Sequence, residues 1–375
     1  MYTYYNPVRT YQGYGSLKAL SDLAHQCADP EETILMLVWN ESVLKTPEIA
    51  AFVAEEKYHL VIQCFTASNP ELSQLFEMYQ QTKMLNVDLV IAIGGGSVLD
   101  VGKSLCCLYG KNIDSEEQLR QMIRKKTYGA PDCRWIGIPT TAGTGSEVTC
   151  WATIWDSPNN AKYSVDTQAN YAYAAIADPT LAASMPVKLA VSSALDAVAH
   201  AAESYWAMAS NPTSKALALR AISTIMNSID DLLETGSKEA HDAMAKGSLL
   251  AGLAFSNTRT TACHSISYPL TMQCHIPHGV AVSVLLGPVL ELNLPAIAQP
   301  VPLLRAFGAA SAEQVGQRIS GILKAAGHPV HLREWGASEE MLPGLVAHSI
   351  TKGRADNNPV ELTKTVVSNI LKSIL

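Results

Sequence analysis

The first half of the chain alternates short apolar runs with segments of helical periodicity, and this alternation constrains the fold more than any other feature. Helical patterns at 47–57 and 71–86 separate the first three runs. Strands that alternate with helices predict a parallel sheet with helices on both faces. Almost continuous apolar strands also fit a sheet that is buried on both sides. The runs that we predict as strands are residues 34–39, 60–65, 89–93 and 135–138.

The second half has a different character. From about Pro186 the sequence is rich in Ala, Leu, Ser and Met and carries few strand signals. The predicted helices are residues 187–209, 214–234, 238–255 and 311–326. Proline breaks at 178–179 and 185–186 mark the change. We predict an α/β domain over residues 1–183 and an all-helical domain over 184–375, with the active site in the cleft between them.

Composition excludes several classes of protein. The formal net charge is -7 and the one basic run is short, at residues 124–126, so we expect no nucleic-acid partner. No run of about 18 uncharged apolar residues predicts a membrane span. The first ten residues lack the pattern of a secretory signal. The eight cysteines are scattered without a CxxC pair, which indicates reduced thiols in a cytoplasmic protein.

A glycine-rich turn follows the third apolar run. Gly95 and Gly96 allow the backbone to approach a phosphate closely, and Ser97 can cap the helix that follows. The N-terminus of that helix then offers free N–H groups and a positive dipole end to the anion. The pattern differs from the G-x-G-x-x-G fingerprint, so an ordinary tight turn remains the alternative.

A second turn follows the fourth apolar run, at residues 138–147. It places the hydroxyls of Thr140, Thr141 and Thr144 close to two glycines, a combination that suits phosphate and ribose groups. A capped helix start is the alternative interpretation. Two glycine turns at strand ends, about 45 residues apart in the sequence, favour a bound dinucleotide.

The helical half carries a possible metal site. Asp196 and His200 are four residues apart, so both project from one face of a helix. His264 and His278 follow later in the chain. One carboxylate and three imidazoles suit a divalent metal such as Fe(II) or Zn(II). Taken singly, each histidine also fits a core or capping role. A competing zinc site would use Cys263, Cys274, His275 and His278.

Taken together, these segments resemble the iron-containing (group III) alcohol dehydrogenases. The resemblance covers nearly the whole chain. It rests on the segments 94–97, 139–147, 176–181, 251–257 and 358–359, on Asp100 and Lys103, and on Asp196, His200, His264 and the Pro277-His278-Gly279 run.

The resemblance implies a two-domain fold, with NAD(P)H at the N-terminal sheet and one metal in the cleft on Asp196, His200, His264 and His278. Fe(II) is the implied ion and Zn(II) the alternative. A homo-oligomer, a dimer or larger, is implied as well. The residues implied to contact the cofactor are Asn69, Gly95, Gly96, Ser97, Asp100, Thr140, Thr141, Thr144, Lys162 and Leu181.

Two departures from the family pattern concern the cofactor and the proton. Asn40 stands where members that select NAD tend to carry an acidic residue, so a 2′-phosphate is not repelled and NADPH is admitted. Glu41 nearby leaves the choice open. Tyr268 stands where many members carry a further histidine. Tyr268, His275 or a water molecule is therefore the candidate proton donor.

A third departure is Arg259, which stands where the family usually has small residues. A guanidinium matches the geometry of a phosphonate or carboxylate, although a surface arginine is the alternative. The segment 263–271 resembles the branch that reduces phosphonoacetaldehyde to 2-hydroxyethylphosphonate. We therefore predict a metal-dependent oxidoreductase that transfers a hydride between NAD(P)H and a small aldehyde/alcohol pair, with the anionic phosphonoacetaldehyde as one candidate substrate. A glycerol dehydrogenase-like or dehydroquinate synthase-like enzyme and a non-catalytic binding protein are the alternatives.

Overall fold

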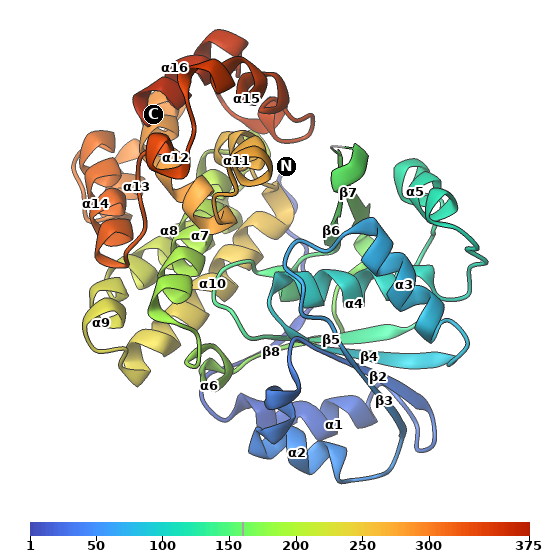
Figure 1. Cartoon of the computed structure of the whole chain (residues 1–375). Helices are drawn as coiled ribbons and strands as arrows, with labels where there is room; N and C mark the ends of the chain where they lie inside the picture. The colour runs from blue at the N-terminus through green and yellow to red at the C-terminus, as the bar shows by residue number, and fades with distance from the viewer. Residues whose placement is uncertain (160) are drawn as a thin grey trace. The chain divides into compact units, whose positions relative to one another are not determined.

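The computed structural model describes residues 1–159 and 161–375. The chain divides into two compact units (Figure 1). The α/β unit comprises residues 6–141 and 146–182. The helical unit comprises residues 1–5, 142–145 and 183–375. The fold is the predicted one, an α/β unit built on a parallel sheet and a helical unit.

The α/β unit is built on a six-stranded sheet in the order β1-β8-β5-β4-β2-β3, and every neighbouring pair of strands is parallel. The strands are β1 (Arg9–Gln12), β2 (Thr33–Val38), β3 (His59–Cys64), β4 (Val87–Gly94), β5 (Arg134–Pro139) and β8 (Ala174–Ala177). The four predicted strands are confirmed as β2, β3, β4 and β5. The sequence did not reveal β1, which is exposed throughout, or β8, which has four residues.

Helices cover both faces of this sheet. Alternate side chains of β2 enter different cores: Leu35 and Leu37 pack with α3 and α4, whereas Ile34 and Met36 pack with α1 and α2. Figure 1 shows these two helix pairs on opposite faces. Burial on both faces explains why the central strands are almost wholly apolar. The helices are α1 (Leu20–His25), α2 (Pro47–Val53), α3 (Leu72–Thr82), α4 (Gly96–Leu108), α5 (Glu116–Lys125) and α6 (Pro179–Ala182).

A second sheet in the α/β unit was not predicted. It is the antiparallel hairpin of β6 (Trp151–Asp156) and β7 (Ala161–Asp166). The backbone N–H of Trp155 donates to the carbonyl of Pro70 at 2.8 Å, so the hairpin lies beside the start of α3. Only one of its two strands is strongly apolar in sequence, which is why the pattern gave no clear strand signal.

The helical unit is organised around α7, which packs against α8, α10 and α12. Predicted helices at 187–209, 238–255 and 311–326 correspond to α7, α10 and α14. The prediction of one helix over 214–234 is wrong, because α8 ends at Met226 and α9 begins at Ile229. Asn227 and Ser228, both weak helix formers, interrupt it. The helices are α7 (Val187–Trp206), α8 (Pro212–Met226), α9 (Ile229–Glu234), α10 (Lys238–Thr258), α11 (Ala262–Cys274), α12 (His278–Asn293), α13 (Pro300–Ala306), α14 (Ala312–Ala325), α15 (Leu342–His348) and α16 (Lys364–Ser373).

One segment of the helical unit passes a length and hydropathy test for a membrane span. It covers α12 and the turn after it, His278–Ala296, with a mean hydropathy of 1.5. Within the unit, 61% of the tested window is buried, and side chains such as Val280 and Leu285 belong to the apolar core. A mostly buried core helix of a globular protein meets the same length and hydropathy criteria.

Candidate functional site

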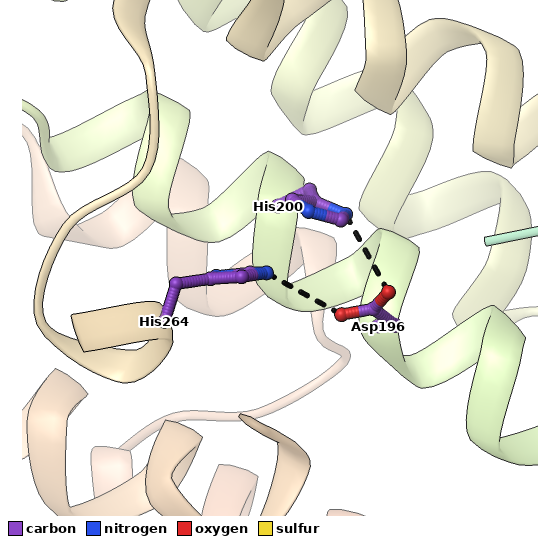
Figure 2. A group of neighbouring side chains, drawn as sticks. All are labelled: Asp196, His200 and His264. Carbon is purple, nitrogen blue, oxygen red and sulfur yellow. Dashed lines mark ion pairs between the residues drawn. The ribbon is translucent and has the colours of Figure 1, made fainter. Parts of the chain in front are cut away.

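Three buried side chains of the helical unit converge on one point (Figure 2). Asp196 and His200 project from α7 and His264 from α11. His264 Nε2 lies 3.4 Å from Asp196 Oδ1, and His200 Nδ1 lies 4.0 Å from Asp196 Oδ2. All three potential ligand atoms lie within 4.8 Å of one another. The three side chains that we predicted as metal ligands from two distant segments are thus neighbours.

These three side chains also present buried polar atoms that lack hydrogen-bond partners. The atoms are Asp196 Oδ1, His200 Nδ1 and His264 Nε2. Leaving such groups unsatisfied costs about 1–3 kcal/mol each. One carboxylate oxygen and two imidazole nitrogens are a donor set that suits a divalent metal. The residues therefore fit the ion that the sequence predicts.

Protonation at this cluster follows from burial and charge. Burial lowers the pKa of His200 to about 4, which keeps the imidazole neutral at pH 7. Burial alone would raise the pKa of Asp196. The nearby His200 and His264 imidazoles outweigh burial and hold the pKa of this carboxyl group well below its usual range. A neutral imidazole and an anionic carboxylate are the protonation states that metal ligation requires.

Glu203, fully buried on α7, is a member of the site that sequence analysis missed. One carboxylate oxygen accepts from Thr261 Oγ1 at 3.0 Å and from the backbone N–H groups of Cys263 and His264 at the start of α11. The other oxygen pairs with His264 Nδ1. Glu203 therefore has two roles. It orients the His264 ring, and it accepts hydrogen bonds from the free N–H groups at the N-terminus of α11. The available signal was its position, seven residues after Asp196 on one helix face.

The carboxylates set the protonation of His264. Burial alone would lower the pKa of His264, but Glu203 and Asp196 outweigh burial and raise the pKa to about 9. Without metal, His264 is therefore an imidazolium between two carboxylates at neutral pH. To hold a metal, His264 would have to lose one proton, and the Nδ1–H bond to Glu203 would fix the tautomer that leaves Nε2 available.

His278, the fourth predicted ligand, lies beside this group. Its ring meets the His264 ring edge-on, with centroids 5.5 Å apart, at the first residue of α12. It does not belong to the set of three whose ligand atoms lie within 4.8 Å. The structure therefore brings His278 next to the cluster, and its role as a ligand stays a prediction.

The competing cysteine-histidine zinc site is wrong. Cys263 lies in the first turn of α11 and Cys274 at its end. They are eleven positions apart on the helix, about 16 Å at 1.5 Å per residue, so they cannot share one ion. His275 follows Cys274 in a left-handed conformation (φ 55°) and is exposed.

Two further predicted residues lie in this unit. Tyr268 is buried on α11, and its ring lies parallel to the His278 ring with centroids 6.3 Å apart. Arg259 caps the end of α10 with a positive φ (65°) and is part-buried. The structure thus places the Tyr268 ring beside His278, whose ring in turn contacts His264. Another arginine, Arg354, lies over the Tyr268 ring, a contact that the sequence did not indicate.

In the α/β unit, the predicted cofactor residues gather at the carboxyl ends of parallel strands. Asn40 follows β2, Gly95–Ser97 follow β4, Thr140 and Thr141 follow β5, and Leu181 follows β8. Asn40 Oδ1 accepts from the N–H of Ser42 and caps the turn after β2. Dinucleotides bind at this edge in doubly wound sheets.

The two glycine turns touch each other. The N–H of Thr140 donates to the carbonyl of Gly94 at 3.0 Å. A Cβ atom at Gly95 would lie 3.3 Å from Thr141, so a larger residue there would crowd the second turn. The N–H of Asn69 donates to Ser97 Oγ at 3.1 Å, which adds the segment after β3 to the same edge.

The other predicted cofactor residues lie in three different settings. Lys162 lies on β7 with Nζ 4.8 Å from the centre of the Trp155 ring. Asp100 faces inward from α4, accepts from Ser146 Oγ at 2.6 Å and from the N–H of Thr153 at 2.8 Å, and so anchors the fold. Thr144 belongs to the helical unit, with residues 142–145. Their contacts with a cofactor remain predictions.

Comparisons with known proteins agree with this arrangement. Residues 7–179 match the family described as iron-containing alcohol dehydrogenase, and residues 190–375 match the C-terminal part of the Fe-containing alcohol dehydrogenase family. The 1,3-propanediol dehydrogenase of Klebsiella pneumoniae is 32% identical over 289 residues, which are 72% of each chain. The sulfoacetaldehyde reductase of Bilophila wadsworthia (strain 3_1_6) is 33% identical over 215 residues, 57% of this chain and 54% of that protein. The crystal structure of sulfoacetaldehyde reductase from Bifidobacterium kashiwanohense in complex with NAD+ matches with a TM-score of 0.88 and 25% identity, covering 100% of this chain and 98% of that one.

Proposed function

Because the chain belongs to the iron-containing alcohol dehydrogenase family and is an NAD(P)-dependent enzyme acting on CH–OH donors, we propose that it reduces a small anionic aldehyde. Phosphonoacetaldehyde, reduced to 2-hydroxyethylphosphonate, is our first candidate. The observation that carries the metal-dependent chemistry is the buried Asp196, His200 and His264 group with its unsatisfied atoms. The anionic substrate is supported by Arg259 and by the likeness to reductases of sulfoacetaldehyde, whose sulfonate is also a tetrahedral anion.

Asp196, His200 and His264 would hold the metal, and we propose His278 as the fourth ligand. Fe(II) is the proposed ion, with Zn(II) as the competitor that usually binds nitrogen sites more tightly. When bound, the ion supplies Lewis acidity that polarises the aldehyde carbonyl. Glu203 holds the His264 ring in the orientation and tautomer that ligation needs.

The strand-end residues of the α/β unit would hold the dinucleotide, whose reduced nicotinamide supplies the hydride when bound. The glycine turn at 94–97 would receive the phosphates at the N-terminus of α4. Asn40 carries no charge, so we propose that NADPH is accepted as well as NADH. The remaining proposed contacts are Asn69, Thr140, Thr141, Thr144, Lys162 and Leu181, whereas the hydrogen bonds of Asp100 to Ser146 and Thr153 give it a structural role instead.

Tyr268 is our proposed proton donor to the nascent alkoxide. Burial raises the pKa of its hydroxyl, so the group stays protonated at neutral pH. Its ring stacks on His278, beside the Asp196, His200 and His264 group. His275 is less well placed because it is exposed at the end of α11.

The family relationship implies small alcohols and aldehydes as partners. We propose that the chain forms a homo-oligomer, a dimer or larger, and works in the cytoplasm. Light scattering of the purified protein measures the first, and fractionation of cells measures the second.

A panel of aldehydes tests the proposed function. The metal-loaded enzyme is assayed with phosphonoacetaldehyde, sulfoacetaldehyde and the neutral propionaldehyde, each with NADH and with NADPH. We expect kcat/KM for an anionic aldehyde to exceed that for propionaldehyde by about tenfold or more, since a charge-assisted hydrogen bond contributes about 1.5–3 kcal/mol. Equal values, or a preference for propionaldehyde, would contradict an anionic substrate.

The variant Arg259→Gln tests the proposed head-group contact. We expect KM for the anionic aldehyde to rise by about tenfold or more, because the variant removes a charge-assisted hydrogen bond. KM for propionaldehyde should stay within about twofold. An equal change for both substrates would show that Arg259 supports the fold of the α10–α11 turn instead.

A further inference from the structure

A short segment near the C-terminus is fastened to the helical unit at both of its ends. We call residues 349–358 the anchored segment. At its start, Ser265 Oγ of α11 donates to the carbonyl of Ser349 at 2.5 Å and accepts from the N–H of Thr351 at 2.9 Å. At its end, Asn358 and Asn293 of α12 exchange two side-chain hydrogen bonds of 2.8 Å.

The anchored segment is also tied to the turn that carries Arg259. Asn357 Nδ2 donates to the carbonyls of Thr258 at 2.8 Å and Thr260 at 3.1 Å. The residues between the anchors are therefore held against α11 and the α10–α11 turn. This matters because α11 carries both His264 and Tyr268.

Arg354 lies between the two anchors, and its guanidinium carbon is 5.1 Å from the centre of the Tyr268 ring. The Tyr268 ring is in turn parallel to the His278 ring, at 12° and 6.3 Å. One phenol ring thus separates the guanidinium from a histidine of the candidate metal site. Burial raises the pKa of the Tyr268 hydroxyl, and the positive charge of Arg354 together with its hydrogen bond to that side chain opposes the rise.

The positive charge of Arg354 has no acidic partner within the part of the chain that the structure describes. Among residues 1–159 and 161–375, no ion pair within 4.0 Å involves Arg354, whereas Arg120, Arg318 and Arg333 each pair with an acidic side chain. Arg354 is also part-buried. A guanidinium in this state favours an anionic ligand, because partial exclusion of water strengthens charge-assisted hydrogen bonds.

We propose that Arg354 binds the anionic head group of the substrate, a phosphonate or a sulfonate, while the aldehyde carbonyl faces the metal cluster. The inference rests on the proposed function and adds to it a second residue for head-group selection, besides Arg259. The reaction stays balanced as hydride transfer to the carbonyl carbon and protonation of the oxygen, and Arg354 takes part in neither. It is a specificity residue, and the planar guanidinium can pair two of its N–H groups with two oxygens of a tetrahedral anion.

The test compares Arg354→Gln, Arg354→Met and Arg354→Lys with the wild-type holoenzyme. Arg354→Met keeps an apolar chain over Tyr268 and removes the charge, so it guards against a variant that loses packing. Arg333→Gln is the matched control, because Arg333 is an exposed arginine of the same unit that pairs with Glu339. Metal content and thermal unfolding are measured for each variant.

We expect Arg354→Gln and Arg354→Met to lower kcat/KM for phosphonoacetaldehyde and sulfoacetaldehyde by about 10- to 100-fold, mainly through KM. Activity with propionaldehyde should fall at least about fivefold less than activity with the anionic aldehydes, and its smaller loss follows from the position of Arg354 over Tyr268, the proposed proton donor. Arg354→Lys should recover part of the loss, because it keeps the charge but not the bidentate geometry. Ethylphosphonate should inhibit the wild type competitively and inhibit Arg354→Gln at least about tenfold more weakly.

The failures of the two proposals are distinguishable. A wild-type enzyme that does not prefer anionic aldehydes and does not bind ethylphosphonate overturns the proposed function and this inference together. A wild type that prefers anionic aldehydes, with Arg354 variants that keep that preference, overturns this inference alone. Equal losses for anionic and neutral aldehydes in all three variants would assign Arg354 a structural role and also overturn the inference.

Discussion

Each unit of this protein buries a cluster of charged side chains, and the two clusters differ in how completely they are satisfied. In the α/β unit, the fully buried Lys103 ammonium donates to the carbonyls of Ser146 at 2.8 Å and Trp151 at 2.7 Å, and pairs with Asp100 at 3.3 Å. In the helical unit, atoms of Asp196, His200 and His264 meet without hydrogen-bond partners. The first cluster is complete by itself, and the second needs another component.

This difference separates two kinds of motif residue that the sequence alone could not distinguish. Asp100 and Lys103 belong to the family pattern as clearly as Asp196 and His200 do. The structure shows Asp100 and Lys103 holding α4 against the segment 146–153. Buried polar groups are normally satisfied within the fold, so the unsatisfied cluster is the one that indicates a ligand.

The largest effect should follow from removing one of the three candidate metal ligands of the helical cluster. Asp196→Asn replaces an anionic ligand by a neutral amide of the same shape. We expect metal content to fall to background and kcat/KM to fall by about a thousandfold or more, because Lewis-acid stabilisation contributes several kcal/mol. Elemental analysis and steady-state kinetics measure both quantities.

Wild-type protein dialysed against a chelator is the control for Asp196→Asn. It should lose activity and regain it when Fe(II) or Zn(II) is restored, whereas Asp196→Asn should not recover. Full activity in protein verified to be free of metal would reject a metal-dependent reaction.

A change in the complete cluster should instead affect stability. Lys103→Met removes the buried ammonium and leaves the Asp100 carboxylate and two carbonyls without their partner. We expect the free energy of unfolding to fall by about 2–4 kcal/mol, somewhat less than when a buried ion pair is broken completely, because Asp100 keeps its hydrogen bonds from Ser146 and Thr153. Urea denaturation measures this, and metal content of the folded fraction should not change.

Lys111→Met is the matched control for Lys103→Met. Lys111 pairs with Asp132 at 3.3 Å near the surface, and removing an exposed pair changes stability by about 1 kcal/mol or less. If Lys103→Met kept its stability but lost NADPH binding, the α/β cluster would belong to the cofactor site and the comparison between the two clusters would fail.

A smaller effect should follow from Glu203→Gln, which tests how His264 of the helical cluster is held in place. The amide keeps one oxygen for the N–H groups at the start of α11 but can no longer accept from His264 Nδ1. We expect metal affinity to fall by about 10- to 100-fold, as is typical for residues that orient a metal-bound histidine. Competition with a chelating dye measures the affinity.

Glu339→Gln serves as the control for Glu203→Gln, because Glu339 is an exposed carboxylate of the same unit. A Glu203→Gln protein with unchanged metal affinity and a lower unfolding temperature would show that Glu203 acts only as a cap of α11.

Sequence patterns predicted the parts of the molecule that depend on local periodicity. The central strands were readable because burial on both faces makes them apolar, and α7 was readable from its length. The exposed edge strand β1 (Arg9–Gln12) has no such pattern, and its pairing with β8, more than 150 residues later, is a tertiary effect. The same holds for the break after Met226, where two polar residues outweigh helical periodicity.

The residues of the candidate site also fall into two groups, those that the sequence predicted and those that only the structure revealed. Asp196, His200 and His264 could be predicted because carboxylate and imidazole groups are uncommon in apolar helices. Glu203 was hidden because a glutamate on a helix is usually a solvated residue, and only the packing of α11 against α7 reveals its partner. Arg354 was hidden because its neighbour Tyr268 lies 86 residues earlier, and nothing local connects the two.

The anchored segment has a consequence for how such enzymes diversify. Its attachments use serine, threonine and asparagine at the two ends, so the side chain at position 354 can be exchanged without touching a metal ligand. If Arg354 selects the head group as proposed, one or two replacements within this short stretch would change the substrate range. Exchanging residues 352–356 with those of a relative would then alter head-group preference without replacing Asp196, His200 or His264.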